Sequence, residues 1–208
     1  MRILIADDHE LVRGGLAKII AEEFSCSKIA EVSGGIEAEE NARVGKWDLI
    51  IMDMSMPDKT GLDVLKQLRV ESIKTPVLIL SIHPENQYAL RVLKAGGHGY
   101  ISKNCLHANF IYAVKTALSG KKYISADMAE QLASRFDGDT NKEQYELISD
   151  RELQVLKFIA SGKTISEIAA ELSLSVATIS TYRRRLLEKM NLKNSAELAL
   201  YAINNHLV

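Results

Sequence analysis

Five short apolar runs, each followed by a longer amphipathic stretch, fill the first 120 residues and constrain the fold more than any other feature. The runs cover residues 3–6, 28–32, 49–52, 76–80 and 98–101. Three of them are almost continuous in β-branched residues and leucine, which is typical of parallel strands covered on both faces. The pattern predicts an α/β fold with a doubly wound, five-stranded parallel sheet.

The stretches between the runs have helical periodicity, near residues 10–22, 36–45, 61–70, 86–95 and 106–119. In the first stretch, one stripe carries Leu11, Leu16, Ile19 and Ile20. A stripe of this kind is expected to pack against a sheet, with polar residues on the opposite side.

The balance of basic and acidic residues changes after residue 124. Residues 1–124 carry 16 basic and 15 acidic side chains, residues 125–148 carry 2 and 6, and residues 149–208 carry 8 and 6. Residues 126–136 can form a short helix, whereas residues 137–142 are polar, contain a turn signal and lack periodicity. We therefore predict a first domain over residues 1–122, a linker with a short helix over 123–147, and a second domain over 148–208.

Polar side chains follow four of the predicted strands. Asp7 and Asp8 follow the first strand, Asp53 the third, Ser81 the fourth and Lys103 the fifth. In an open parallel sheet, ligands bind outside the carboxyl ends of the strands. An aspartate or the serine alone would suit a turn or a helix cap, but the whole set predicts a Mg²⁺ site where a carboxylate attacks a phosphoryl group. The lysine would supply a point charge and the serine a hydrogen bond.

Four segments resemble the receiver domain of response regulators, over residues 2 to about 120. They are Asp7-Asp8-His9, residues 53–57 with Gly61, Leu80-Ser81, and residues 95–103. The resemblance implies a flavodoxin-like sheet in the strand order 2-1-3-4-5. It also implies that Asp53 is the phosphoacceptor, that Asp7, Asp8, Asp53 and the backbone carbonyl of Ser55 bind Mg²⁺, and that Ser81 and Tyr100 are switch residues.

The last sixty residues are helical in pattern, near 149–161, 164–172, 176–190 and 196–204. Ser149 with Glu152 and Thr164 with Glu167 have capping-box spacing, and Ser175 is placed to cap the third of these helices. The third helix has an apolar stripe and an opposite face with small residues and arginines. This arrangement predicts a helix-turn-helix, although a plain helical bundle with solvated arginines fits the same pattern. The stripe consists of Val176, Ile179, Leu186, Leu187 and Met190.

In detail, residues 148–207 resemble the LuxR-type domain of the NarL/FixJ family. The resemblance implies base-facing positions at Ser180, Thr181 and Arg184, and a dimer contact through the last helix. It implies phosphate contacts by Lys163, Thr164, Tyr182, Arg183, Arg185 and Lys189. Many members have Lys and His at positions 180 and 182, so the operator sequence stays open. Similar variants occur in the branch that resembles the regulators GacA and UvrY, which also shares the residues at 52–57.

These features predict a cytoplasmic transcription regulator, not an enzyme, that receives a phosphoryl group from a sensor histidine kinase and binds double-stranded DNA as a homodimer. We expect no signal peptide and no membrane segment, since the apolar runs are short. Cys26 and Cys105 are expected to be free thiols. Two alternatives remain: an aspartyl-phosphate phosphohydrolase, and a receiver whose C-terminal helices bind a protein partner.

Overall fold

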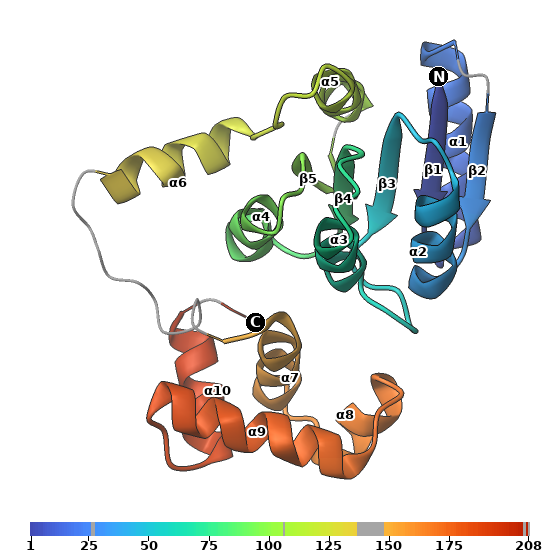
Figure 1. Cartoon of the computed structure of the whole chain (residues 1–208). Coiled ribbons are helices and arrows are strands. Elements are labelled where there is room, and N and C mark those ends of the chain that lie inside the picture. The colour runs from blue at the N-terminus through green and yellow to red at the C-terminus, as the bar shows by residue number, and fades with distance from the viewer. Residues whose placement is uncertain (26–27, 106, 137–147, 206, 208) are drawn as a thin grey trace. The chain divides into compact units, whose positions relative to one another are not determined.

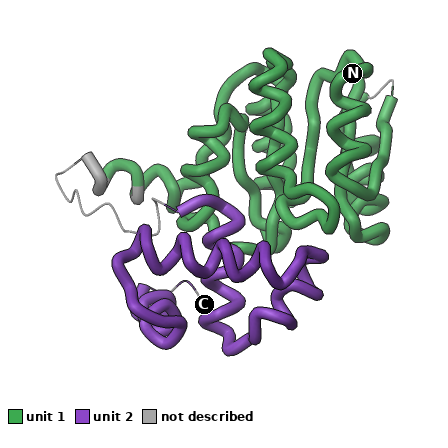
Figure 2. Tube along the Cα trace, turned by 60° about the horizontal axis from the view of Figure 1, so that its bottom comes forward, with its two compact units in different colours: residues 1–137 green, residues 138–208 purple. Residues whose placement is uncertain are grey.

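The structure is a computed structural model that describes residues 1–25, 28–105, 107–136, 148–205 and 207. The chain divides into two compact units, residues 1–137 and 138–208 (Figure 2). The polar part of the predicted linker, together with Cys26, lies outside the described residues.

In the first unit, strands and helices alternate along the chain (Figure 1). The strands form one parallel sheet in the order β2-β1-β3-β4-β5, which confirms the predicted topology. The elements are β1 (Arg2–Ala6), α1 (Glu10–Glu23), β2 (Lys28–Val32), α2 (Gly35–Val44), β3 (Leu49–Asp53), α3 (Gly61–Val70), β4 (Val77–Ser81), α4 (Glu85–Lys94), β5 (Gly99–Ser102) and α5 (His107–Leu118).

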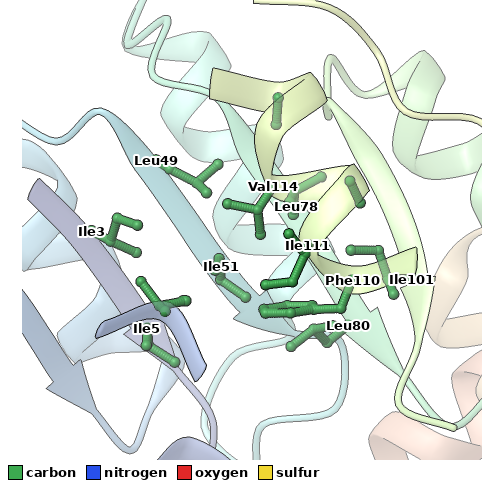
Figure 3. Close-up of a cluster of buried hydrophobic side chains, with 13 residues drawn as sticks. Ile3, Ile5, Leu49, Ile51, Leu78, Leu80, Ile101, Phe110, Ile111 and Val114 are labelled. Carbon is green, nitrogen blue, oxygen red and sulfur yellow. The ribbon is translucent and has the colours of Figure 1, made fainter. Parts of the chain in front are cut away.

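Helices cover both faces of the sheet, α1 and α5 on one face and α2, α3 and α4 on the other (Figure 1). Every residue of β3 and β4 is buried, as their continuous apolar composition predicts. Successive side chains of a strand point to opposite faces, so each strand contributes to both cores. Figure 3 shows the core beneath α5, which includes Ile3, Ile5, Leu49, Ile51, Leu78, Leu80, Ile101, Phe110, Ile111 and Val114.

α6 (Ala126–Phe136) belongs to the first unit, because it packs on α4 and buries Met128. Ser125 caps this helix by accepting a hydrogen bond from the Met128 N–H, at 3.1 Å. The Tyr123 N–H donates to the carbonyl of His98 at 2.7 Å, which fixes the chain that leads into α6. The predicted short helix is therefore present and docked on the sheet domain.

The described part of the second unit forms four helices, α7 (Asp150–Ala160), α8 (Ile165–Glu171), α9 (Val176–Met190) and α10 (Ser195–Asn204). Both predicted capping boxes are present, at the starts of α7 and α8. Ser175 accepts a hydrogen bond from the Thr178 N–H at 3.0 Å, as predicted for the cap of α9. No helix in the described ranges is both long and apolar enough to cross a membrane.

Two residues of the predicted apolar stripes are exposed, while Leu16, Ile19 and Leu187 are half-buried. Leu11 is 92% exposed and Val176 is 50% exposed. Each lies in the first turn of its helix, where α1 and α9 have only just begun. A first turn extends past the element against which the rest of the helix packs, so periodicity alone misplaced these two side chains.

The central strand offers a test of this architecture. Ile51 is fully buried in β3, so Ile51→Ala should lower the free energy of unfolding by about 2–5 kcal/mol. Urea unfolding can be followed by the fluorescence of Trp47, the single tryptophan, which is buried close to the start of β3. A loss below about 1 kcal/mol would contradict a close-packed core at this position.

Candidate functional site

The carboxyl ends of β1, β3 and β5 bring three charged side chains together. The ammonium of Lys103 lies 2.8 Å from Asp7 Oδ2 and 3.0 Å from Asp53 Oδ2. Asp7 is fully buried and Asp53 is 3% exposed. The parallel register causes this convergence. Ala6 pairs with Met52, and each charged residue is either the last residue of its strand or the one directly after it.

The electrostatics of this cluster leave a negative charge uncompensated. Burial raises the pKa of Asp53, although Lys103 partly offsets the effect. Burial acts to lower the pKa of Lys103, but hydrogen bonds to Asp7 and Asp53 raise it overall, so the lysine is a cation. Two carboxylates share that one ammonium, and Asp8 adds a third carboxylate at the rim. A further cation would be stabilised here.

The donor set fits a hard divalent cation. Ligand atoms of Asp7, Asp8, His9 and Asp53 all lie within 4.8 Å of one another. The buried Asp7 Oδ2 has the Lys103 ammonium, 2.8 Å away, as its partner among the described residues, so part of its acceptor capacity is left for a further cation. Clustered carboxylate oxygens with unsatisfied acceptor capacity suit Mg²⁺. The predicted ligands Asp7, Asp8 and Asp53 are thus brought together.

Two residues that the sequence analysis did not assign hold the acidic pair. Arg13 donates from Nη1 to the backbone carbonyl of Asp7 at 2.8 Å, and the His9 N–H donates to Asp7 Oδ1 at 2.9 Å. The His9 ring lies 2.8 Å from Asp8 Oδ1. The position of His9 next to the acidic pair in the sequence indicates its contact with that pair. The contact of Arg13 depends on the direction of α1 relative to β1, which the sequence does not show.

Gly61 allows α3 to begin against the end of β3. A Cβ atom at this position would lie 2.2 Å from the carbonyl oxygen of Asp53, closer than any side chain can approach. The Gly61 N–H donates to the carbonyl of Met54 at 3.0 Å. The glycine therefore closes the loop that follows Asp53.

The two predicted switch residues meet at one residue of the β4–α4 loop. Ser81 Oγ accepts a hydrogen bond from the His83 N–H at 3.0 Å. Tyr100 lies inward at 1% exposure, and its hydroxyl donates to the His83 carbonyl at 2.7 Å. Burial raises the pKa of Tyr100, so the hydroxyl keeps its proton and remains a donor. Ser81 and Tyr100 thus hold the backbone of His83 from both sides.

His83 also reaches the loop after Asp53. Its Nε2 lies 3.4 Å from Ser55 Oγ, and its ring lies beside that of Tyr88 with centroids 5.3 Å apart. The His83 side chain therefore connects the β4–α4 loop with the β3–α3 loop.

In the second unit, α8 and α9 pack together as a helix-turn-helix. The turn between them places Ser173 in the left-handed region, with φ of 52°. The predicted base-facing residues Ser180 and Arg184 are exposed, and Thr181 is half-buried with its hydroxyl bonded to the carbonyl of Ala177 at 3.0 Å. One face of α9 is thus available to a ligand.

The predicted phosphate contacts fall into two groups. Arg185 is exposed and Tyr182 is half-buried. The other four are engaged within their own unit. Thr164 is exposed but caps α8, and its hydroxyl donates to Glu167 Oε2 at 2.8 Å. Arg183 donates to Ser195 Oγ at 2.6 Å, Lys189 lies 2.7 Å from Glu152 Oε2, and Lys163 pairs with Glu171.

Comparison with known proteins matches both units to families. Residues 3–115 match the response regulator receiver domain, and residues 146–202 match the bacterial regulatory proteins of the luxR family. The response regulator UvrY of Escherichia coli (strain K12) is 33% identical over 208 residues, covering 100% of this chain and 95% of that protein. The response regulator GacA of Pseudomonas viridiflava is 32% identical over 209 residues, covering 100% and 98%.

Among solved structures, RcsB from Salmonella enterica serovar Typhimurium, bound to promoter rprA in the presence of the phosphomimetic BeF3-, has a TM-score of 0.63. It is 22% identical and the match covers 97% of this chain and 98% of that one, a likeness of fold. The family consists of transcription regulators and not enzymes, which removes the phosphohydrolase alternative. The chain belongs to the NarL/FixJ family of response regulators, DNA-binding transcription regulators that join a receiver to a LuxR-type helix-turn-helix.

Proposed function

We propose that a sensor histidine kinase phosphorylates Asp53 and that the phosphoryl group controls DNA binding by the second unit. The observation that carries the proposal is the buried Asp53 carboxylate, held 3.0 Å from the Lys103 ammonium beside a second buried carboxylate. A nucleophile in such a site is aligned before the phosphodonor arrives, and phosphoryl transfer depends mainly on positioning and charge stabilisation.

In this mechanism an Asp53 oxygen forms a bond to phosphorus while the bond from phosphorus to the donor's histidine nitrogen breaks. Asp7, Asp8, Asp53 and the backbone carbonyl of Ser55 would hold Mg²⁺, which neutralises charge on the transferring group. Lys103, already next to Asp53, would move its contact to a phosphoryl oxygen.

The signal would leave the site through the β4–α4 loop. When the Ser81 hydroxyl turns to the new phosphoryl group, the His83 N–H loses its acceptor. Tyr100 still donates a hydrogen bond to the His83 carbonyl, so the loop would change its conformation while this contact to the buried tyrosine is kept. The loss of one hydrogen bond at His83, while the other is kept, can bias a bistable segment.

On the DNA side, α9 would enter the major groove with Ser180, Thr181 and Arg184 toward the bases. The predicted contacts to phosphate come from Lys163, Thr164, Tyr182, Arg183, Arg185 and Lys189. On α10, Leu200 is 59% exposed and Ile203 is 53% exposed, which supports the predicted homodimer contact through this helix.

Phosphorylation control is tested by operator binding with and without acetyl phosphate. The operator is first obtained by selecting DNA from a random pool with the phosphorylated protein. The wild-type protein should bind it about 10-fold more tightly with the phosphodonor, while Asp53→Ala should not respond, because it lacks the nucleophile. Equal affinity in all conditions, measured by fluorescence anisotropy, would refute the proposed control and leave the family assignment intact.

The DNA-contacting face is tested with Arg184→Ala. Loss of a base-facing arginine should cost about 1–3 kcal/mol in operator affinity and relax the preference at one base position. Lys157→Ala removes the same charge from α7 and is the control, with an expected change below about 0.5 kcal/mol. If the two variants lose affinity equally, α9 does not provide sequence readout at Arg184.

The charge cluster is tested with Lys103→Ala. Without the ammonium, two buried carboxylates lose their cation, and the free energy of unfolding should fall by about 3 kcal/mol at pH 7. The pKa of Asp53, already raised by burial, rises further, so folding favours its protonated form and stability is lost as the pH increases through that pKa.

The loss should therefore be smaller at pH 4.5 than at pH 7, and millimolar Mg²⁺ should recover part of it by replacing the cation. Lys121→Ala, at an exposed position, is the control and should leave stability within about 0.5 kcal/mol. A deficit for Lys103→Ala that does not depend on pH would contradict the electrostatic explanation.

A further inference from the structure

The loop that joins β3 to α3 is tied to α2 through Asp58. Its Oδ1 accepts hydrogen bonds from the N–H groups of Gly35 and Lys59, both at 2.8 Å, and Oδ2 accepts from the Ile36 N–H at 2.9 Å. The N-cap residue of α2 is Gly34, which has no side chain to accept these bonds. Asp58 therefore caps α2 from another part of the chain.

The electrostatics keep this cap charged. Burial alone would raise the pKa of Asp58, but the backbone N–H groups of Ile36, Gly35 and Lys59 hold it below its usual range. A carboxylate at a helix N-terminus is also favoured by the helix dipole. The tie between the loop and α2 is thus a set of charge-assisted hydrogen bonds, which are stronger than neutral ones.

A second contact holds the same segment. The ammonium of Lys59 pairs with the carboxylate of Glu39, which is 8% exposed on α2. The backbones come close at this point, since a Cβ atom on Gly35 would lie 2.2 Å from the Lys59 carbonyl oxygen. The loop therefore lies directly on the start of α2.

These contacts connect the loop after Asp53 with the end of β1, where Asp7 lies. Upstream, the Met54 N–H donates to the carbonyl of Leu80 at 2.8 Å and fixes the beginning of the loop. Downstream, Asp58 fixes it to α2, which packs against β1, and β1 ends next to Asp7. Ser55 lies between these two anchors, so its position relative to Asp7 depends on both.

We propose that Asp58 is a positioning residue for metal binding: by holding the loop on α2, it sets the direction of the Ser55 carbonyl toward the acidic pair. The inference rests on the proposed Mg²⁺ site and assigns to it a residue that does not contact the ion. Mg²⁺ demands nearly ideal octahedral geometry, so a loop free to move should bind it less tightly. Residues that orient metal ligands from outside typically change affinity by an order of magnitude.

The test compares Mg²⁺ titrations of the full chain, without phosphodonor, followed by amide chemical shifts of the loop. Asp58→Ala should raise the Mg²⁺ concentration at half-saturation roughly 10-fold and speed hydrogen exchange at the Gly35 and Ile36 amides. Asp58→Asn, which keeps one acceptor oxygen, should fall between this variant and the wild type. Asp48→Ala is the control: it removes a carboxylate that accepts the Arg2 N–H at 2.7 Å, before β3 begins, and should leave Mg²⁺ affinity unchanged.

Wild-type Mg²⁺ affinity in Asp58→Ala, with faster exchange at Gly35 and Ile36, would overturn the inference while the proposed function stands. A wild-type protein that does not bind Mg²⁺ would overturn the proposed site itself and this inference with it. Should Asp58→Ala not fold, Gly35→Ala replaces it, since the added Cβ pushes the loop from α2 without removing a charge. An unchanged affinity in that variant would equally overturn the inference.

Discussion

The site depends on one ammonium group shared by two buried carboxylates. Burying an isolated carboxylate costs several kcal/mol, and this chain buries Asp7 and Asp53 side by side. Lys103 offsets part of that cost but cannot neutralise both. The folded state therefore holds an unbalanced negative charge at the carboxyl edge of the sheet. A cation bound there would offset this charge, and a phosphoryl group could then be accepted beside it.

Such a cluster requires a rigid frame, because small displacements change buried charge interactions by large amounts. The apolar layers on both sides of the sheet provide the frame, and hydrogen bonds fix the loops that surround the site. Arg13 holds the carbonyl of Asp7, Asp58 holds the loop after Asp53 on α2, and Ser81 with Tyr100 holds His83. The β4–α4 loop differs from the others, since one of its two anchors, the Ser81 hydroxyl, is proposed to turn to the phosphoryl group while Tyr100 keeps its contact.

The sequence pattern was sufficient to predict a parallel sheet and the convergence of Asp7, Asp53 and Lys103, because parallel strands align their carboxyl ends. The strand order came from the resemblance to receiver domains. It was not sufficient for Asp58, whose partner lies 23 residues away and is a backbone N–H group with no side-chain signature. Leu11 and Val176 were misplaced for a related reason. Periodicity assigns a residue to a helix face, but only the packed structure shows how far along the helix that face is covered.

In the second unit, contacts within the unit engage side chains that are proposed to bind DNA. Five cationic side chains were predicted to face DNA, yet four of them make ion pairs or hydrogen bonds within the unit: Lys163, Arg183, Arg184 and Lys189. Affinity for DNA depends on how many phosphates a protein neutralises, and each contact adds about 0.9 to the slope of log affinity against log salt. A unit that must break its own contacts to gain phosphates binds weakly alone. In the proposed homodimer, pairing two units through the exposed apolar face of α10 would double the phosphate contacts without adding basic residues to the chain, so a modest excess of basic residues would be enough.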